Sequence, residues 1–181
     1  SIDAKTGNDN WSVKLNFLAS GTSAGFGIVV VADVDGNVIA LDQIDGNVLW
    51  SSNVKGEVLS SVAIDAKIVV VKTGSGELLG LNKDSGEVIW SYRSTLPVLT
   101  IRGNSSPVIV DNLVYASFDN GRLGVFELNS GFQIWDGAIS YVSGASELEN
   151  LIDSDSNPVI EGGLISVSYT HLTLPTIVRV E

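Results

Sequence analysis

Apolar residues in this chain occur in short runs of about five to seven positions, which glycine and polar residues separate. Such runs are typical of buried or half-buried β-strands, and the Asp-Gly, Ser-Gly and Asn-Gly pairs between them favour tight hairpin turns. Nowhere do apolar residues follow the spacing of an amphipathic helix. The pattern therefore predicts three sets of four strands, at residues 17–24, 27–33, 37–42 and 47–53, then 57–64, 67–72, 77–82 and 87–92, then 105–110, 113–117, 122–127 and 132–139.

Two phrases recur along the chain with a period of roughly forty residues. A turn followed by an apolar run occurs at residues 35–41, 75–81 and 120–126. The second phrase is a tryptophan that follows a glycine by four positions, and its pairs are Gly7 and Trp11, Gly46 and Trp50, Gly86 and Trp90, and Gly131 and Trp135. A period of this length with four strands per unit is typical of a β-propeller blade.

A four-stranded unit that is apolar on both faces cannot bury them by itself, but radial stacking of such units can. We expect the glycine of each pair to make the turn into the outer strand and the tryptophan to lie flat against the next blade. Truncating such a tryptophan costs about 3 kcal/mol or more. The sequence thus predicts an all-β fold, a β-propeller fragment with about three complete four-stranded blades and partial blades on either side, over residues 1–166.

The repeat stops at residue 167. The run from Val167 to Thr176 resembles one translated reading frame of a transposon-type sequencing adapter, and it holds the only histidine, His171. We therefore expect residues 167–181 to be a non-native tail, and a divergent strand is the alternative. We also expect an internal fragment of a longer protein, because the chain opens within a motif and contains no methionine.

Composition and charge exclude several classes of function. The formal net charge is −11 and no basic cluster occurs, which argues against a nucleic-acid partner. Without cysteine, this chain can form neither disulfides nor thiolate metal sites, and it has no cysteine nucleophile. No apolar run reaches the roughly 18 residues that a membrane-spanning helix needs.

Candidate catalytic and metal-binding chemistry is weak. Residues 153–157 have the opening spacing of a calcium loop, but Pro158 and Leu164 stand where that loop needs glycine and glutamate. No nucleophile can be matched to a base, and the glycine-rich turns lack the helix of a phosphate-binding loop. We therefore predict no catalytic residue, no metal and no cofactor.

Two connections between blades interrupt the repeat, at residues 94–107 and 139–157. Extra length in a propeller loop usually serves recognition. The alternative is structural, with Arg102 paired to a nearby carboxylate and the apolar residues packed inward. The residues alone leave both interpretations open.

These motifs together resemble one family. The segment from Ala40 to Trp50 is similar to the quinoprotein-type propeller repeat, and Gly80 replaces alanine in the next copy. The connections at residues 99–107 and 144–158 resemble those of the outer-membrane protein assembly factor BamB, a propeller lipoprotein of the β-barrel assembly machinery. The resemblance covers residues 1–166.

The resemblance implies a non-enzymatic, eight-bladed parent, held on the periplasmic face of the outer membrane by a lipid on an N-terminal cysteine. It implies docking on the periplasmic domains of BamA and assistance to unfolded outer-membrane proteins. Carried over by position, the BamA contact would involve Leu99, Ile101, Arg102, Asp153 and Asp155. Ile101 departs from the family pattern, which has leucine there.

Two rival functions remain. A quinone-dependent dehydrogenase can be built on the same blades, but that class is expected to carry a calcium-bound quinone and an adjacent cysteine pair. A generic sensor or scaffold propeller fused to another domain is the second rival.

Overall fold

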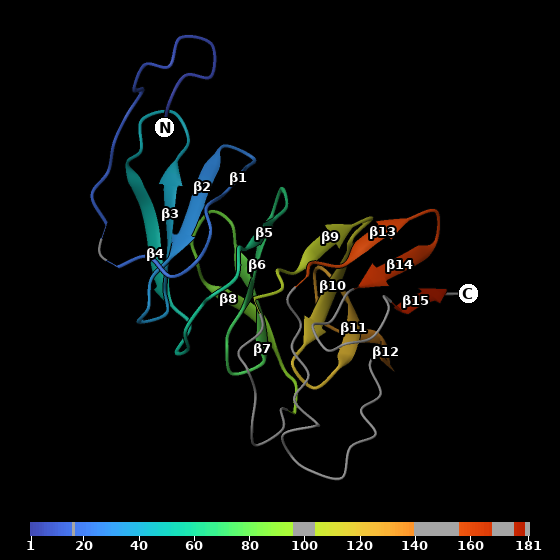
Figure 1. The fold of residues 1–181 in the computed structure, drawn as a ribbon. Helices are drawn as coiled ribbons and strands as arrows, with labels where there is room; N and C mark the ends of the chain where they lie inside the picture. Colours follow the sequence, from blue (N-terminus) through green and yellow to red (C-terminus); the bar gives the residue numbers. More distant parts are fainter. Residues whose placement is uncertain (16, 96–103, 140–155, 168–175, 180–181) are drawn as a thin grey trace.

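The computed structural model describes residues 1–181 except 16, 96–103, 140–155, 168–175 and 180–181. The described residues form an all-β fold of four antiparallel sheets, each made from consecutive strands. Figure 1 shows these sheets following one another along the chain, from the blue first sheet to the red fourth one. The predicted fold class is confirmed, because this arrangement is that of a β-propeller segment.

Each of the first three sheets has four strands in sequence order. The first contains β1 (Ser23–Gly25), β2 (Ile28–Ala32), β3 (Asn37–Asp42) and β4 (Val48–Asn53), and the second contains β5 (Ala63–Ile64), β6 (Ile68–Lys72), β7 (Glu77–Asn82) and β8 (Val88–Arg93). The third contains β9 (Val108–Val110), β10 (Leu113–Phe118), β11 (Arg122–Glu127) and β12 (Gln133–Ala138). The first strands of neighbouring sheets lie together, since β5 contacts both β1 and β9.

The first strand of each of the first three sheets is shorter than the sequence predicts. Residues 57–64 were expected to form a strand, but only Ala63 and Ile64 pair in β5. Val58 and Val62 are buried in the core between the first two sheets. The same shortening occurs in β1 and β9. An apolar run therefore predicts that a segment is buried, but it does not predict whether its backbone pairs with a neighbouring strand.

The core lies between the sheets. Alternate residues of β6 face opposite ways, so that Val69 and Val71 pack toward the first sheet while Ile68 and Val70 pack toward the third. Burying each such side chain contributes about 1.5–3 kcal/mol. Every inner sheet is therefore stabilised by both neighbours.

The fourth sheet has three strands, β13 (Val159–Glu161), β14 (Leu164–Val167) and β15 (Thr176–Arg179). β15 pairs antiparallel with β14, with Leu164 opposite Arg179. β15 lies within the segment predicted to be a non-native tail, and the division of the chain after residue 166 stays a prediction. In the described part of the chain, no helix is long and apolar enough to cross a membrane.

Candidate functional site

Each of three tryptophans docks on the sheet that follows it. The indole of Trp50, from β4, lies against Gly86 in the β7–β8 turn, and its Nε1 donates a hydrogen bond to the carbonyl oxygen of Lys83 at 2.7 Å. A Cβ added at Gly86 would lie 2.5 Å from the indole, and the φ of Gly86 is +73°. Glycine therefore satisfies both the turn and the close approach of the ring.

The same contact occurs at the other two junctions. Trp11 lies against Gly46 and donates to the carbonyl of Gln43 at 3.0 Å, whereas Trp90 lies against Gly131 and donates to the carbonyl of Leu128 at 2.8 Å. The remaining predicted structural residues are Gly7, which adopts a φ of +72° in an N-terminal turn, and Trp135, which is half-buried beside the core between the third and fourth sheets.

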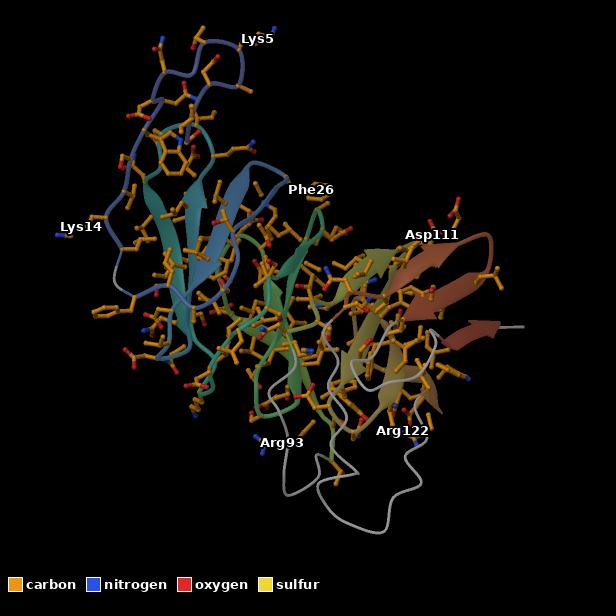
Figure 2. The ribbon with its side chains drawn as sticks, in the orientation of Figure 1. Lys5, Lys14, Phe26, Arg93, Asp111 and Arg122 are labelled. Atoms are coloured by element: carbon orange, nitrogen blue, oxygen red, sulfur yellow. The ribbon has the colours of Figure 1, made fainter. Side chains whose placement is uncertain are left out.

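The connections between sheets leave from one end of the molecule, which we call the linker end. At this end, the residue that follows the last strand of a sheet donates its backbone N–H to a carbonyl oxygen. The acceptor is the glycine in the turn between the second and third strands of the same sheet. These bonds join Val54 to Gly36 at 3.0 Å, Ser94 to Gly76 at 2.9 Å and Ile139 to Gly121 at 2.9 Å. Figure 2 shows Arg93 and Arg122 near this end, and Phe26 and Asp111 in turns at the opposite one.

The five residues expected to contact a partner belong to the two long connections between blades. Leu99, Ile101 and Arg102 fall in residues 96–103, and Asp153 and Asp155 fall in residues 140–155. All five lie outside the described residues, so their role stays a prediction. We call residues 94–107 the first linker and residues 139–157 the second linker.

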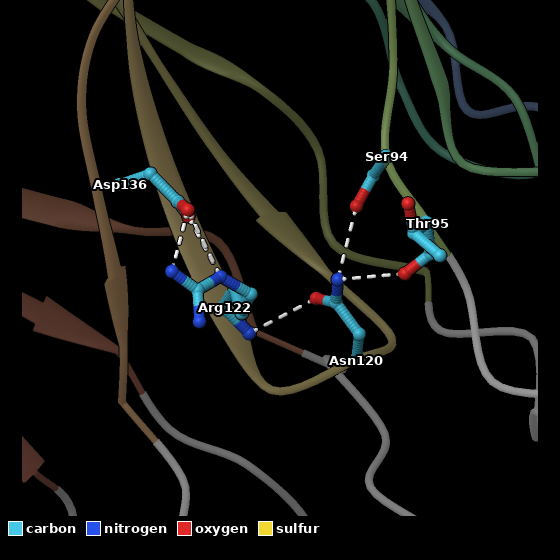
Figure 3. A network of polar contacts seen from close by, with 5 residues as sticks. All are labelled: Ser94, Thr95, Asn120, Arg122 and Asp136. Atoms are coloured by element: carbon cyan, nitrogen blue, oxygen red, sulfur yellow. Dashed lines mark hydrogen bonds and ion pairs between the residues drawn. The ribbon is translucent and has the colours of Figure 1, made fainter.

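The near end of the first linker is held by Asn120, in the turn between β10 and β11 (Figure 3). Its Nδ2 donates to the Ser94 hydroxyl and to the Thr95 carbonyl, both at 3.0 Å. Its Oδ1 accepts a hydrogen bond from the backbone N–H of Arg122 at 3.1 Å. One amide side chain therefore stabilises its own turn and binds the start of the linker.

The far end of the first linker is held by Lys72, from β6 of the second sheet. Its Nζ donates to the Ser105 hydroxyl at 2.6 Å and to the Ser117 carbonyl at 3.1 Å, and both acceptors belong to the third sheet or its approach. The next residue, Ser106, donates its backbone N–H to the Asn157 Oδ1 of the second linker at 2.6 Å. The two linkers are therefore connected to each other.

Asp33 stabilises the corresponding turn of the first sheet. Its buried carboxylate accepts hydrogen bonds from the backbone N–H of Asp35 and from the backbone and side chain of Asn37, at 2.8–2.9 Å. Burial raises the pKa of this carboxyl, but the hydrogen bonds from Asn37, Asp35 and Gly36 outweigh it. The net result is a pKa below the ordinary value for aspartate.

Among the residues that the structure describes, no three histidine, cysteine, aspartate or glutamate side chains are grouped to hold a metal ion. Sequence reasoning missed Lys72, Asn120 and Asn157. Only Lys72 left a signal, as a charged residue ending the apolar run Ile68–Lys72.

Comparison with known proteins assigns the family. The sequence profile described as "Outer membrane protein assembly factor BamB" matches residues 1–172. The chain belongs to the BamB family. A BamB relative from Nitrosomonas eutropha is 39% identical over 170 residues, covering 93% of this chain and 41% of that protein. The chain thus spans about two-fifths of the length of this curated BamB relative.

Solved structures agree on the fold. The crystal structure of BamB from Moraxella catarrhalis superposes with a TM-score of 0.79 at 24% identity, over 84% of this chain and 47% of that one. A quinohemoprotein alcohol dehydrogenase from Pseudomonas putida gives a TM-score of 0.70 at 15% identity, over 88% of this chain and 30% of that one. At these identities the likeness shows the propeller fold alone, whereas the sequence match places the chain in the BamB family.

Proposed function

We propose that this chain is part of a non-catalytic scaffold that docks on the periplasmic domains of BamA and assists the assembly of outer-membrane proteins. The observation that carries the proposal is the family match over residues 1–172. The two long linkers support it further, because their described ends lie at one end of the propeller and are hydrogen-bonded to each other. Two joined linkers can present one continuous binding surface.

The contact would combine an apolar centre with charged flanks. Leu99 and Ile101 would be buried against BamA, and Arg102 would bind a carboxylate or backbone carbonyl there. Asp153 and Asp155, from the second linker, would cap loop amides or pair with a cation of the partner. The mechanism is binding, and it needs neither a cofactor nor a metal.

The intact parent would work at the periplasmic face of the outer membrane, anchored by a lipid and in reach of unfolded outer-membrane proteins. No part of this role requires nucleic acid. The acidic net charge of −11 is compatible with it, since a surface of this sign keeps the protein soluble.

Substituting Arg102→Glu in the intact parent tests the proposal. We expect binding to the BamA periplasmic domains, measured by calorimetry, to weaken at least about a hundredfold, because the substitution replaces an attraction with a repulsion. Lys67→Glu is a matched control, since it makes the same charge change at an exposed position in the turn before β6, away from the linkers. Equal affinity of Arg102→Glu and the unmodified protein would contradict the proposal.

A quinone-dependent dehydrogenase is the second candidate, because a quinohemoprotein alcohol dehydrogenase shares the fold. Incubating the intact parent with pyrroloquinoline quinone and calcium, followed by gel filtration, separates the two functions. We expect no quinone absorbance to co-elute with the protein. A co-eluting chromophore in stoichiometric amount would favour the dehydrogenase.

A further inference from the structure

Two large apolar side chains of the first sheet are exposed at the end opposite the linker end, which we call the turn end. Phe26 lies in the β1–β2 turn and is 58% exposed, and Ile44 lies in the β3–β4 turn and is 86% exposed. The backbone N–H of Gln43 donates to the carbonyl oxygen of Gly27 at 3.1 Å and joins the two turns. Gln43 directly precedes Ile44, and Gly27 directly follows Phe26, which Figure 2 labels.

The blade repeat does not require apolar side chains at these two positions. The equivalent residues of the second and third sheets are small or polar, and all of them are exposed. They are Ala66 and Asp111 in place of Phe26, and Asp84 and Asn129 in place of Ile44. The second and third sheets have a neighbour on both faces, so exposure at these positions does not result from an uncovered sheet.

Phe26 also holds an unfavourable backbone conformation. Its φ is +50° and that of Gly27 is +83°, in a two-residue turn where both central residues are left-handed. Such turns favour asparagine, aspartate and glycine, and the equivalent turn of the third sheet has Asp111 and Asn112. A bulky aromatic residue in this conformation, with its ring largely in solvent, does not stabilise the fold. Contact with a partner explains it better.

The charges beside these two side chains are acidic. Residues 25–28 and 42–48 contain Asp42 and Asp45 and neither lysine nor arginine. At the turn end of the second sheet, carboxylates also outnumber amines, and Lys83 is itself paired with Asp84 at 2.6 Å. These carboxylates are Asp65, Asp84 and Glu87, and the amines are Lys67 and Lys83. An acidic rim attracts cationic groups and repels an anionic lipid surface.

We propose that Phe26 and Ile44 form a docking surface for an extended peptide segment that carries apolar side chains flanked by lysine or arginine. Two side chains on neighbouring turns are too small an area for a folded partner, which usually covers about 800 Å². An extended chain advances about 3.3 Å per residue, so a few residues can contact both turns. Flanking cations would pair with Asp42 and Asp45. This inference goes beyond the proposed docking on BamA and does not depend on it.

Phe26→Asn in the intact parent is the first test. Asparagine tolerates a positive φ, as Asn112 does at +65°, so the variant folds with a melting temperature no lower than that of the unmodified protein. The probe is a labelled synthetic peptide in which phenylalanine and leucine alternate with lysine, and its Kd is measured by fluorescence anisotropy. We expect the Kd to rise at least about tenfold.

Phe17→Asn is the matched control. Phe17 is 84% exposed and precedes the same sheet, but it lies beside the β2–β3 turn at the linker end, where its carbonyl accepts the Val34 N–H at 3.2 Å. It should leave the Kd unchanged. Ile44→Asn, which introduces the residue type of Asn129, should raise the Kd as Phe26→Asn does.

The peptide itself provides the remaining comparisons. Replacing its lysines by glutamate, or its apolar residues by serine, should weaken binding at least about tenfold, and added salt should weaken it further. Equal Kd values for Phe26→Asn and the unmodified protein would overturn the proposal, as would an equal loss in Phe17→Asn. Binding of phosphatidylglycerol vesicles, with no binding of the peptide, would show that the surface contacts lipid instead.

Discussion

At the residue scale, Asp33 shows how a buried charge can stabilise a propeller turn. Its carboxylate accepts three hydrogen bonds within five residues of chain, from Asp35 and Asn37. These bonds satisfy donors that the tight turn would otherwise leave unpaired in a buried place. Thr73 has the corresponding role in the second sheet, where its hydroxyl accepts a hydrogen bond from the Glu77 backbone N–H at 3.1 Å.

We predict that Asp33→Ala lowers the free energy of unfolding by about 1–3 kcal/mol at neutral pH, because it leaves buried donors unsatisfied. The folded-state pKa of Asp33 lies below its unfolded value, so its stabilisation is present above the unfolded pKa of about 4 and disappears as the pH falls through the folded pKa. Urea unfolding of both proteins from neutral to acidic pH measures the difference. The exposed Asp35→Ala is the control, and a difference that grows toward low pH would contradict the argument.

At the scale of the elements, the contacts between tryptophan and glycine connect neighbouring sheets. Each indole covers the glycine of the next sheet and binds a carbonyl three residues before that glycine. The outer strand that carries Trp50 or Trp90 has a register shift directly before the tryptophan, which pairs with Ala40 in the first sheet and with Gly80 in the second. Such a bulge bends the strand and changes the direction of the side chain, which suits a residue that must reach the neighbouring sheet.

We predict that Gly86→Ala destabilises the protein more than Gly27→Ala does. Both glycines have a positive φ, +73° and +83°, so alanine costs about 1–2 kcal/mol at either position. Only at Gly86 would the added Cβ clash with an indole, that of Trp50, which adds about 1–3 kcal/mol. Denaturant unfolding of the two variants measures the difference between their losses in free energy of unfolding. Equal losses would show that the indole of Trp50 does not restrict the side chain at position 86.

At the scale of the whole molecule, burial is unequal among the sheets. Every residue of β6 in the second sheet is buried, since the first and third sheets cover its two faces. The first and last residues of β13 in the fourth sheet are exposed. A sheet that is packed on both faces opens to solvent less readily than one that is packed on a single face.

We predict that hydrogen exchange of this chain is slowest in β6 and β7 and fastest, among the strands, in β13. Exchange measured by mass spectrometry on peptides covering Ile68–Asn82 and Val159–Val167 provides the comparison. Protection of β13 equal to that of β6 would mean that another surface covers the fourth sheet in solution.

Much of the fold could be predicted from local pattern. The strands around Val69, Leu79 and Trp90 alternate or run apolar over a few residues and end at glycine turns, and such signals need no knowledge of distant contacts. The shortened first strands could not be predicted, because Val58 and Val62 are buried between sheets rather than paired in a ladder. The candidate contact residues came from likeness of the linkers. No local signal predicted that Asn120 binds Ser94 and Thr95, or that Asn157 binds Ser106.

The sequence by itself determined the repeat, the four-stranded unit and the tryptophan and glycine pair that joins neighbouring units, because each depends on side-chain size and turn geometry over a few positions. Only the tertiary structure decided which groups meet across units. Lys72 donates to Ser117, 45 residues away, and Ser106 donates to Asn157, 51 residues away. Such contacts depend on how sheets are rotated and spaced against each other, and no short stretch of chain contains that information.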